Sequence, residues 1–120
     1  MKALYHPERE AISLSSFLYA LSDPIRLDIV QMLAQAGERP CGTLGGHVPK
    51  PNMSYHFKVL REAGVIHQRC EGTQRINCLR REDLDARFPG LLDAVLRAGI
   101  ASAVRDQMHT QQGETSLAQI

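Results

Sequence analysis

Apolar residues recur at three- and four-residue intervals along much of the 120-residue chain, a spacing that places them on one face of a helix. The first such stretch runs from Glu8 to Leu21. A second begins at Asp23-Pro24, where a capping aspartate precedes a proline suited to a first helical turn, and it ends at Gly37. The last, from Phe88 to Arg105, has a broad apolar face. The pattern therefore predicts helices at both ends of the chain.

Two further helices are predicted in the middle of the chain. The stretch from Cys41 to Val48 contains two adjacent glycines, so a helix there depends on packing against its neighbours. The stretch from Lys50 to Gly64 has a proline near its start and a terminating glycine. Met53, Phe57 and Leu60 share one face of this helix, which leaves a polar and mostly basic outer face.

A β-hairpin is expected after the fourth helix. Val65–Glu71 and Thr73–Leu79 are extended candidates on either side of a turn signal, Glu71-Gly72. Helix, helix, short helix, helix and hairpin is the order of elements in a winged helix-turn-helix. The predicted fold is therefore mainly α with a small β-hairpin, as one DNA-binding and dimerisation domain over residues 1–106, followed by a flexible polar tail over residues 107–120.

The charge distribution points to the same part of the chain. The net charge is only +1, but residues 47–81 carry seven basic side chains against two acidic ones, while both flanking regions are acidic. A local charge of +5 is the footprint expected of a surface that binds nucleic acid. A solvated charged face is the alternative explanation of such a run.

Two segments resemble a known family. DPIRLDIVQML (Asp23–Leu33) and NMSYHFKVLREAGVI (Asn52–Ile66) are similar to the D-P-x-R-L-x-I-L and S-H-H-L-K-V-L-R-x-A-G-L-V segments of the ArsR/SmtB family of bacterial repressors. The resemblance covers Ala20 to Leu79. It implies a homodimeric winged helix-turn-helix repressor that binds a double-stranded DNA operator. Pro51 departs from the family's usual Ser or Thr and removes one backbone donor.

DNA contacts are expected from the helix that starts at Lys50 and from the hairpin. The first residues of a recognition helix reach base edges in the major groove, and flanking cations neutralise phosphates. Asparagine can make two hydrogen bonds to adenine, and arginine on a wing can hold the backbone or enter the minor groove. The predicted contacts are Lys50, Asn52, Ser54, Tyr55, Lys58, Arg61, Arg69, Gln74 and Arg75. His56, beside Phe57, is expected to be a partly buried structural residue instead.

The apolar faces of the first and last helices suggest a partner, because a broad apolar face on so small a chain is most simply covered by a second copy. In the resembled family these two helices form the homodimer. The predicted interface residues are Leu14, Phe17, Leu18, Leu92, Leu96 and Ile100. Packing of both faces within one chain is the alternative.

Metal ligands typical of the family are missing. Its E-L-C-V-C-D-L segment aligns with Glu38–Leu44, which places Cys41 where the central Val stands and leaves neither flanking thiolate. In the last helix, Asp93 lacks the histidine that the family has two residues later. No metal or other cofactor is therefore expected, although a site using Cys41 and His47 is left open, and His109 stands alone in the tail.

The cysteines do not indicate a disulfide scaffold. Three cysteines in no regular spacing fit a reducing compartment. If Glu71-Gly72 forms the turn, Cys70 and Cys78 lie too far apart on the hairpin for a bond. Oxidation of Cys70 alone, next to Arg69, is left open. With no signal-like N-terminus and no apolar run long enough for a bilayer, we expect a cytoplasmic protein that does not contact a membrane.

No catalytic pattern of nucleophile, base or paired carboxylates occurs, so the chain is not expected to be an enzyme. The prediction is a sequence-specific transcriptional regulator, a repressor that binds a two-fold operator as a homodimer without the family's metal-sensing ligands. The alternatives are a winged-helix protein-interaction module that has lost DNA binding and a thiol-responsive member of the same family. The inducer cannot be predicted from these residues.

Overall fold

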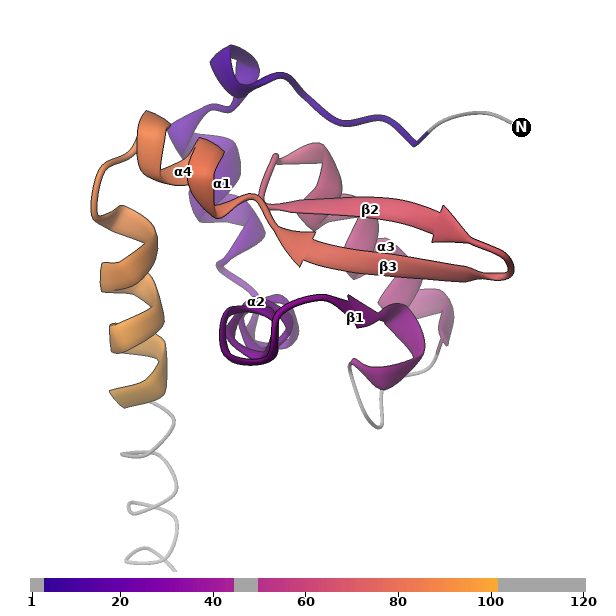
Figure 1. The fold of residues 1–120 in the computed structure, drawn as a ribbon. Coiled ribbons are helices and arrows are strands. Elements are labelled where there is room, and N and C mark those ends of the chain that lie inside the picture. The colour runs from indigo at the N-terminus through magenta and orange to yellow at the C-terminus, as the bar shows by residue number, and fades with distance from the viewer. Residues whose placement is uncertain (1–3, 45–49, 102–120) are drawn as a thin grey trace, which may run out of the picture.

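The computed structural model of the protein describes residues 4–44 and 50–101. Four helices and a three-stranded antiparallel sheet make up most of this part, and a further helix spans residues 91–101 (Figure 1). In chain order the elements are the 3₁₀ helix η1 (Arg9–Ala11), α1 (Leu14–Ala20), α2 (Pro24–Ala36), β1 (Arg39–Pro40), the 3₁₀ helix η2 (Cys41–Thr43), α3 (Lys50–Glu62), β2 (Ile66–Glu71), β3 (Gln74–Leu79) and α4 (Arg81–Arg87). This is the winged helix-turn-helix expected from the sequence.

Helix α2 begins and ends where the local signals predict. The Asp23 carboxylate accepts hydrogen bonds from the backbone N–H groups of Ile25, at 2.8 Å, and Arg26, at 3.3 Å. Pro24 occupies the first helical position, where its missing N–H is not needed. Gly37 closes the helix with a φ of 76°, a conformation that favours glycine.

The first predicted helix, Glu8–Leu21, is wrong as a continuous element. η1 ends at Ala11, and Ile12 is extended and almost fully buried. α1 starts afresh after Ser13, whose hydroxyl accepts a hydrogen bond from the backbone N–H of Ser16 at 3.2 Å. Burial of the Ile12 side chain and the new cap at Ser13 together outweigh the helical periodicity of this stretch.

The short helix predicted over Cys41–Val48 is described only in its first half. There, Cys41–Thr43 forms the 3₁₀ turn η2 and Leu44 is not helical, while residues 45–49 lie outside the described residues. The two residues before it form β1, which pairs Arg39 with Asn77 and Pro40 with Ile76 of β3. The chain therefore enters η2 directly from a strand that pairs with a segment distant in sequence.

The hairpin is confirmed, with its turn one residue later than expected. Glu71 pairs with Gln74, so the two-residue loop is Gly72-Thr73 and not Glu71-Gly72. Gly72 takes the first loop position with a φ of 60°. The strand order is β1-β3-β2, which leaves β2 as an edge of the sheet.

The last helix starts later than predicted and is preceded by one that the pattern missed. Instead of one helix from Phe88 to Arg105, α4 ends at Arg87 and the helix over 91–101 follows Gly90, which has a φ of 79°. α4 buries only Leu84, so it carries no apolar periodicity to detect. The predicted residues 102–105 and the tail over 107–120 lie outside the described residues.

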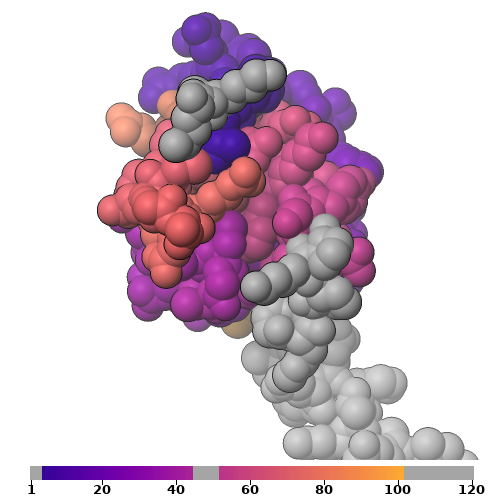
Figure 2. Space-filling view, turned by 90° about the vertical axis from the view of Figure 1, so that its right-hand side faces the viewer, coloured from indigo at the N-terminus to yellow at the C-terminus, as the bar shows by residue number. Residues whose placement is uncertain are grey.

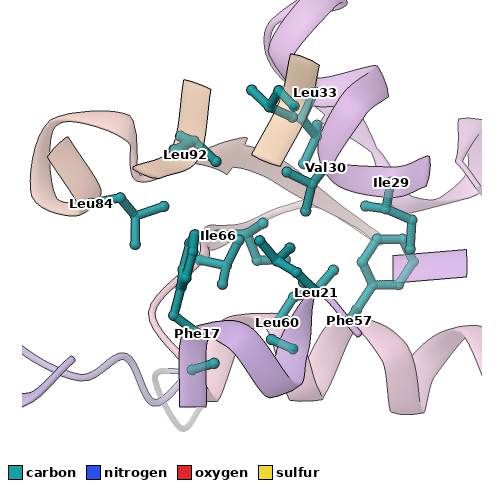
Figure 3. Packing of buried hydrophobic residues seen from close by; sticks show 14 of the residues in the cluster. Phe17, Leu21, Ile29, Val30, Leu33, Phe57, Leu60, Ile66, Leu84 and Leu92 are labelled. Atoms are coloured by element: carbon teal, nitrogen blue, oxygen red, sulfur yellow. The ribbon is translucent and has the colours of Figure 1, made fainter. Parts of the chain in front are cut away.

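One hydrophobic core joins all these helices to the sheet (Figure 3). Its members come from every part of the described chain, including Phe17 of α1, Ile29 of α2, Leu60 of α3, Ile66 of β2 and Leu92 of the last helix. The hairpin tip projects on one side of the molecule and the helix over 91–101 lies on the opposite side (Figure 1). Among the described residues, no helix combines the length and apolar character needed to cross a membrane.

Candidate nucleic-acid interface

Helix α3 has one buried face and one exposed face, as the sequence predicts for a recognition helix. Met53, Phe57 and Leu60 are 7%, 4% and 0% exposed and belong to the core. On the other side, solvent reaches four of the predicted DNA contacts, Asn52, Ser54, Tyr55 and Lys58. The structure describes the backbone of Lys50 at the start of α3, while the position of its side chain lies outside the described part. Four polar side chains of α3 are therefore exposed on the face opposite the core.

Gly64 fixes where this helix ends and how the chain continues into the hairpin. It has a φ of 81°, and a Cβ at this position would lie 2.5 Å from Cγ1 of Ile12. The chain therefore turns directly into β2 while the backbone lies against a buried side chain of the N-terminal segment. A larger residue would displace either Ile12 or the start of the hairpin.

The hairpin, or wing, packs beside α3, and Figure 2 shows both on one face of the molecule. Gln74 and Arg75 start β3 next to the loop, and both are exposed. Within the described residues, Arg75 forms no ion pair. A cation at the wing tip is therefore free to hold a phosphate.

Arg69 is already matched by acidic side chains. Its guanidinium pairs with both carboxylate oxygens of Glu38 and, at 3.0 Å, with Glu71. The hydrogen bond from Arg69 lowers the pKa of Glu38, so the pair is ionised at neutral pH. Arg69 is part of the wing, as predicted, but two carboxylates offset its charge.

Arg61 is the clearest correction to the predicted contacts. Only 8% of it is exposed. Its Nε donates to the carbonyl of Tyr5 at 3.1 Å, and a terminal nitrogen donates to Oε1 of Gln68 at 2.8 Å. Because the side chain is nearly buried and two of its nitrogens donate inside the protein, the expectation that Arg61 holds a phosphate does not fit the structure.

A polar cluster missed by the sequence analysis connects the wing to the segment before α3. Gln68 and Asn77 are 2% and 0% exposed, and Nε2 of Gln68 donates to Oδ1 of Asn77 at 2.7 Å. Asn77 donates in turn to the carbonyl of Arg39, at 3.1 Å, and to the Cys41 sulfur, at 3.2 Å. The alternation of buried Ile66 and Gln68 along β2 is the signal that could have revealed it. Cys41 thus accepts internal hydrogen bonds at the start of η2.

The remaining cysteines lie apart. Cys70 is opposite Arg75 and Cys78 is opposite His67, so the hairpin does not bring the two sulfurs together. Burial raises the pKa of the Cys78 thiol. In residues 4–44 and 50–101, no three His, Cys, Asp or Glu side chains are grouped so that they could hold a metal ion. His47 and His109 lie outside these ranges.

The structure separates the predicted dimer residues into two groups. Phe17, Leu92 and Leu96 are 0%, 1% and 8% exposed and pack in the core of the single chain, so they cannot form an interface while the fold is intact. Leu14 and Leu18 of α1 and Ile100 of the last helix are 48%, 46% and 45% exposed. For the first group, the packing within one chain that the sequence left open is what occurs.

His56 lies between the exposed Tyr55 and the buried Phe57 and is itself buried, as the sequence suggested. Its Nδ1 is 3.2 Å from a guanidinium nitrogen of Arg26, a residue of α2. Because a guanidinium only donates, Nδ1 is the acceptor in this hydrogen bond. Helix α3 is thus linked to helix α2 through these two buried side chains.

Comparisons with known proteins agree with this arrangement. A helix-turn-helix domain model matches residues 21–69, which include α2 and α3. The chain is 38% identical over 79 residues to the HTH-type transcriptional regulator YceK of Bacillus subtilis (strain 168), covering 63% of this chain and 79% of YceK.

Solved structures share the fold over a large part of the chain. The transcriptional repressor BigR from Xylella fastidiosa is 28% identical, with a TM-score of 0.52 over 62% of this chain and 85% of BigR. The ArsR family transcriptional regulator RHA00566 is 19% identical, with a TM-score of 0.57 over 88% of this chain and 98% of its own, which shows a shared fold. Together with its two sequence motifs, the YceK relationship establishes that the chain belongs to the winged helix-turn-helix transcriptional regulators of the ArsR type.

Proposed function

We propose that this regulator binds a two-fold DNA operator as a homodimer and represses transcription from it. The observation that carries the proposal is the exposed polar face of α3, which lies beside the wing on one face of the molecule (Figure 2). The width of the B-DNA major groove admits one such helix, and the wing then lies along the adjacent backbone.

The exposed side chains suit separate parts of a DNA site. Asn52 has the donor and acceptor needed for two hydrogen bonds to adenine, while the Ser54 and Tyr55 hydroxyls can reach a base edge or a phosphate. Lys58 and Arg75 carry charges suited to phosphates. In this proposal Lys50 and Gln74 remain DNA contacts. Arg69 contributes less to DNA binding than its charge suggests, and Arg61 is no longer among the proposed contacts.

A second copy supplies the second recognition helix. Leu14 and Leu18 project from α1 as large exposed apolar side chains, and Ile100 does so from the last helix. Burying them against the same surface of another chain would remove apolar area from water and give a two-fold dimer. The two copies of α3 would then enter major grooves about 34 Å apart, one turn of the duplex.

Repression is proposed because BigR, which shares the fold and 28% of aligned residues, is named a transcriptional repressor. We propose no catalytic role and a cytoplasmic location, where the DNA of a bacterial cell lies. We also propose that metals are not the signal, since the family's thiolate pair is absent from Glu38–Leu44. Zinc, cadmium and arsenite should leave operator affinity unchanged, and stoichiometric release by any of them in wild type and in Cys41→Ser alike would reveal a metal site elsewhere.

Fluorescence anisotropy tests the central proposal. The probe is the DNA region upstream of the protein's own gene, compared with unrelated duplex of equal length at two salt concentrations. A specific regulator prefers the upstream region by about a thousandfold or more, and the preference survives at the higher salt. Equal, weak and strongly salt-dependent binding to both duplexes, or none at all, would support the protein-interaction module instead.

A further inference from the structure

Arg26 caps the end of α1 although it belongs to the first turn of α2. The side chain is only 4% exposed. Its Nε donates to the carbonyl of Ala20 at 2.7 Å and a terminal nitrogen donates to the carbonyl of Tyr19 at 3.2 Å. The guanidinium also stands over the Tyr19 ring, 5.3 Å from its centroid. These are the last two carbonyls of α1, and that of Tyr19 also accepts hydrogen bonds from the backbone N–H of Ser22, at 3.1 Å, and from its hydroxyl, at 2.6 Å.

The remaining terminal nitrogen of the same guanidinium reaches the recognition helix. It contacts Nδ1 of His56 at 3.2 Å. The His56 ring in turn lies 5.7 Å, centroid to centroid, from the ring of Tyr55, one of the exposed residues of α3. One rigid planar group therefore meets the end of α1, the start of α2 and the middle of α3.

Burying this charge is costly in stability. The ion pairs formed within the described residues do not include Arg26, so neutral carbonyls, an imidazole and the face of the Tyr19 ring compensate for its lost hydration. An apolar side chain of similar volume often stabilises a buried site as well as a charged one. Arginine adds geometric specificity here, because its planar donors hold three acceptors in fixed positions relative to one another.

We propose that Arg26 is a positioning residue for DNA recognition: it sets the orientation of α3 relative to α1, and so the placement of Asn52 and Tyr55 against their base pairs. The inference rests on the proposed function, in which α3 reads bases. The same orientation also affects the proposed dimer. Since Leu14 and Leu18 on α1 are proposed to contact the partner, the angle between α1 and α3 also sets the distance between the two recognition helices.

Arg26→Met tests the role, with Arg87→Met as a matched control. Arg87 also donates two hydrogen bonds to a backbone carbonyl, that of Ile12, at 3.1 and 2.8 Å, and also lies over an aromatic ring, that of Phe88. It has no contact with α3 among those hydrogen bonds. We expect Arg26→Met to reduce the preference for operator over unrelated DNA about tenfold, while affinity for unrelated DNA changes less than about twofold. Arg87→Met should lower the melting temperature and keep the preference.

Two variants of His56 examine the contact from the other side. His56→Asn places an amide oxygen near the position of Nδ1 and should keep most of the preference, whereas His56→Leu should lose as much as Arg26→Met. The double variant Arg26→Met with His56→Leu should be no worse than either single variant, because both remove the same link. If Arg26→Met does not fold, His56→Leu carries the test, since it leaves the cap on α1 intact.

A measurement without DNA separates this inference from the proposed function. Nitrogen NMR of wild type should show Nδ1 of His56 as a hydrogen-bond acceptor that carries no proton, and Arg26→Met should lose that signature. If the wild type binds upstream and unrelated DNA equally, the proposed function fails and the inference fails with it. If the wild type discriminates and Arg26→Met discriminates equally well, only the inference is overturned. Losses that add up in the double variant would also overturn it.

Discussion

The imidazole ring of His6 stacks on that of His67, with centroids 4.3 Å apart and planes 11° apart. His6 belongs to the N-terminal segment that crosses the edge strand β2, and its Nε2 accepts a hydrogen bond from the backbone N–H of Gln68 at 3.0 Å. Burial lowers the pKa of His6, and the nearby charges of His67, Arg61 and Arg80 lower it further, against a backbone hydrogen bond at Leu4 that raises it. The N-terminal segment is therefore held to the wing by a neutral histidine.

Acid should weaken that attachment. In the unfolded chain His6 has a pKa near 6.5, and folding lowers it, so the unfolded state binds more protons as the pH falls below that value. The stability contributed by His6 is present above pH 6.5 and is lost below it. Urea unfolding between about pH 7.5 and 5.5 should show a smaller loss for His6→Gln, whose side chain can accept but does not titrate. Identical losses in both proteins would contradict this role.

Two glycines that both have a positive φ should differ in their tolerance of alanine. Both Gly37 and Gly64 have positive φ, 76° and 81°, but a Cβ at Gly37 meets nothing within 4 Å whereas one at Gly64 lies 2.5 Å from Ile12. Gly37→Ala should lower the free energy of unfolding by about 1–3 kcal/mol, the cost of the backbone conformation alone. Gly64→Ala adds overpacking, for a total of about 2–5 kcal/mol. Equal values in urea unfolding would mean that Ile12 moves away without cost.

The contact between Ile12 and Gly64 also explains which elements could be predicted from the sequence. Helix α2 was correct because its signals are local: a cap at Asp23, a proline at Pro24 and a glycine at Gly37. The break between η1 and α1 was missed because it depends on Ile12 packing against Gly64, a contact between segments distant in sequence. Periodicity reports which residues can share a face but not which of them a distant segment will bury.

In the candidate site, too, the sequence pattern does not report contacts between distant segments. Arg61 and Arg75 look equivalent in the sequence, as two cations in one basic region. The structure separates them because Arg61 finds acceptors on Tyr5 and Gln68, whereas Arg75 is exposed near the wing tip. The positions of those acceptors depend on the path of the N-terminal segment across β2, which the sequence pattern does not give.

Dimerisation should depend on the exposed apolar residues only. Leu18→Glu places a charge on a side chain that is 46% exposed in the single chain, so the protein should remain folded and become monomeric. Tyr5→Glu, at another large exposed apolar residue away from α1 and the last helix, should remain dimeric. Sedimentation velocity and circular dichroism together check both outcomes.

Leu96→Glu distinguishes an interface residue from a core residue. Because Leu96 is 8% exposed within one chain, a glutamate there should cause unfolding, not a folded monomer. A folded dimer of Leu18→Glu would move the interface off α1. A folded monomer of Leu96→Glu would instead place that residue in the interface as the sequence first suggested.

Asn52 and Arg75 should affect DNA binding in different ways. Asn52→Ala should weaken operator binding by about 1–3 kcal/mol and relax discrimination at one base pair in each half-site, because a side chain that reads a base edge is lost. Its affinity for unrelated DNA and its dependence on salt should stay close to those of wild type, since no phosphate contact is removed. Anisotropy with operators substituted one base pair at a time measures both quantities.

Arg75→Ala should weaken operator and unrelated DNA alike, because a phosphate contact carries no sequence information. Each neutralised phosphate releases about one counterion, and a dimer carries two copies of Arg75, so the slope of log K against log salt should fall by about two. Arg69→Ala provides the control on the same hairpin. Because the charge of Arg69 is already paired with Glu38 and Glu71, its binding to a phosphate would release fewer counterions. The slope should therefore change by less than in Arg75→Ala. Equal slope changes for both arginines would mean that the ion pairs of Arg69 open on DNA. If Arg75→Ala altered base preference while Asn52→Ala did not, the wing would read the sequence through the minor groove and α3 would only hold the backbone.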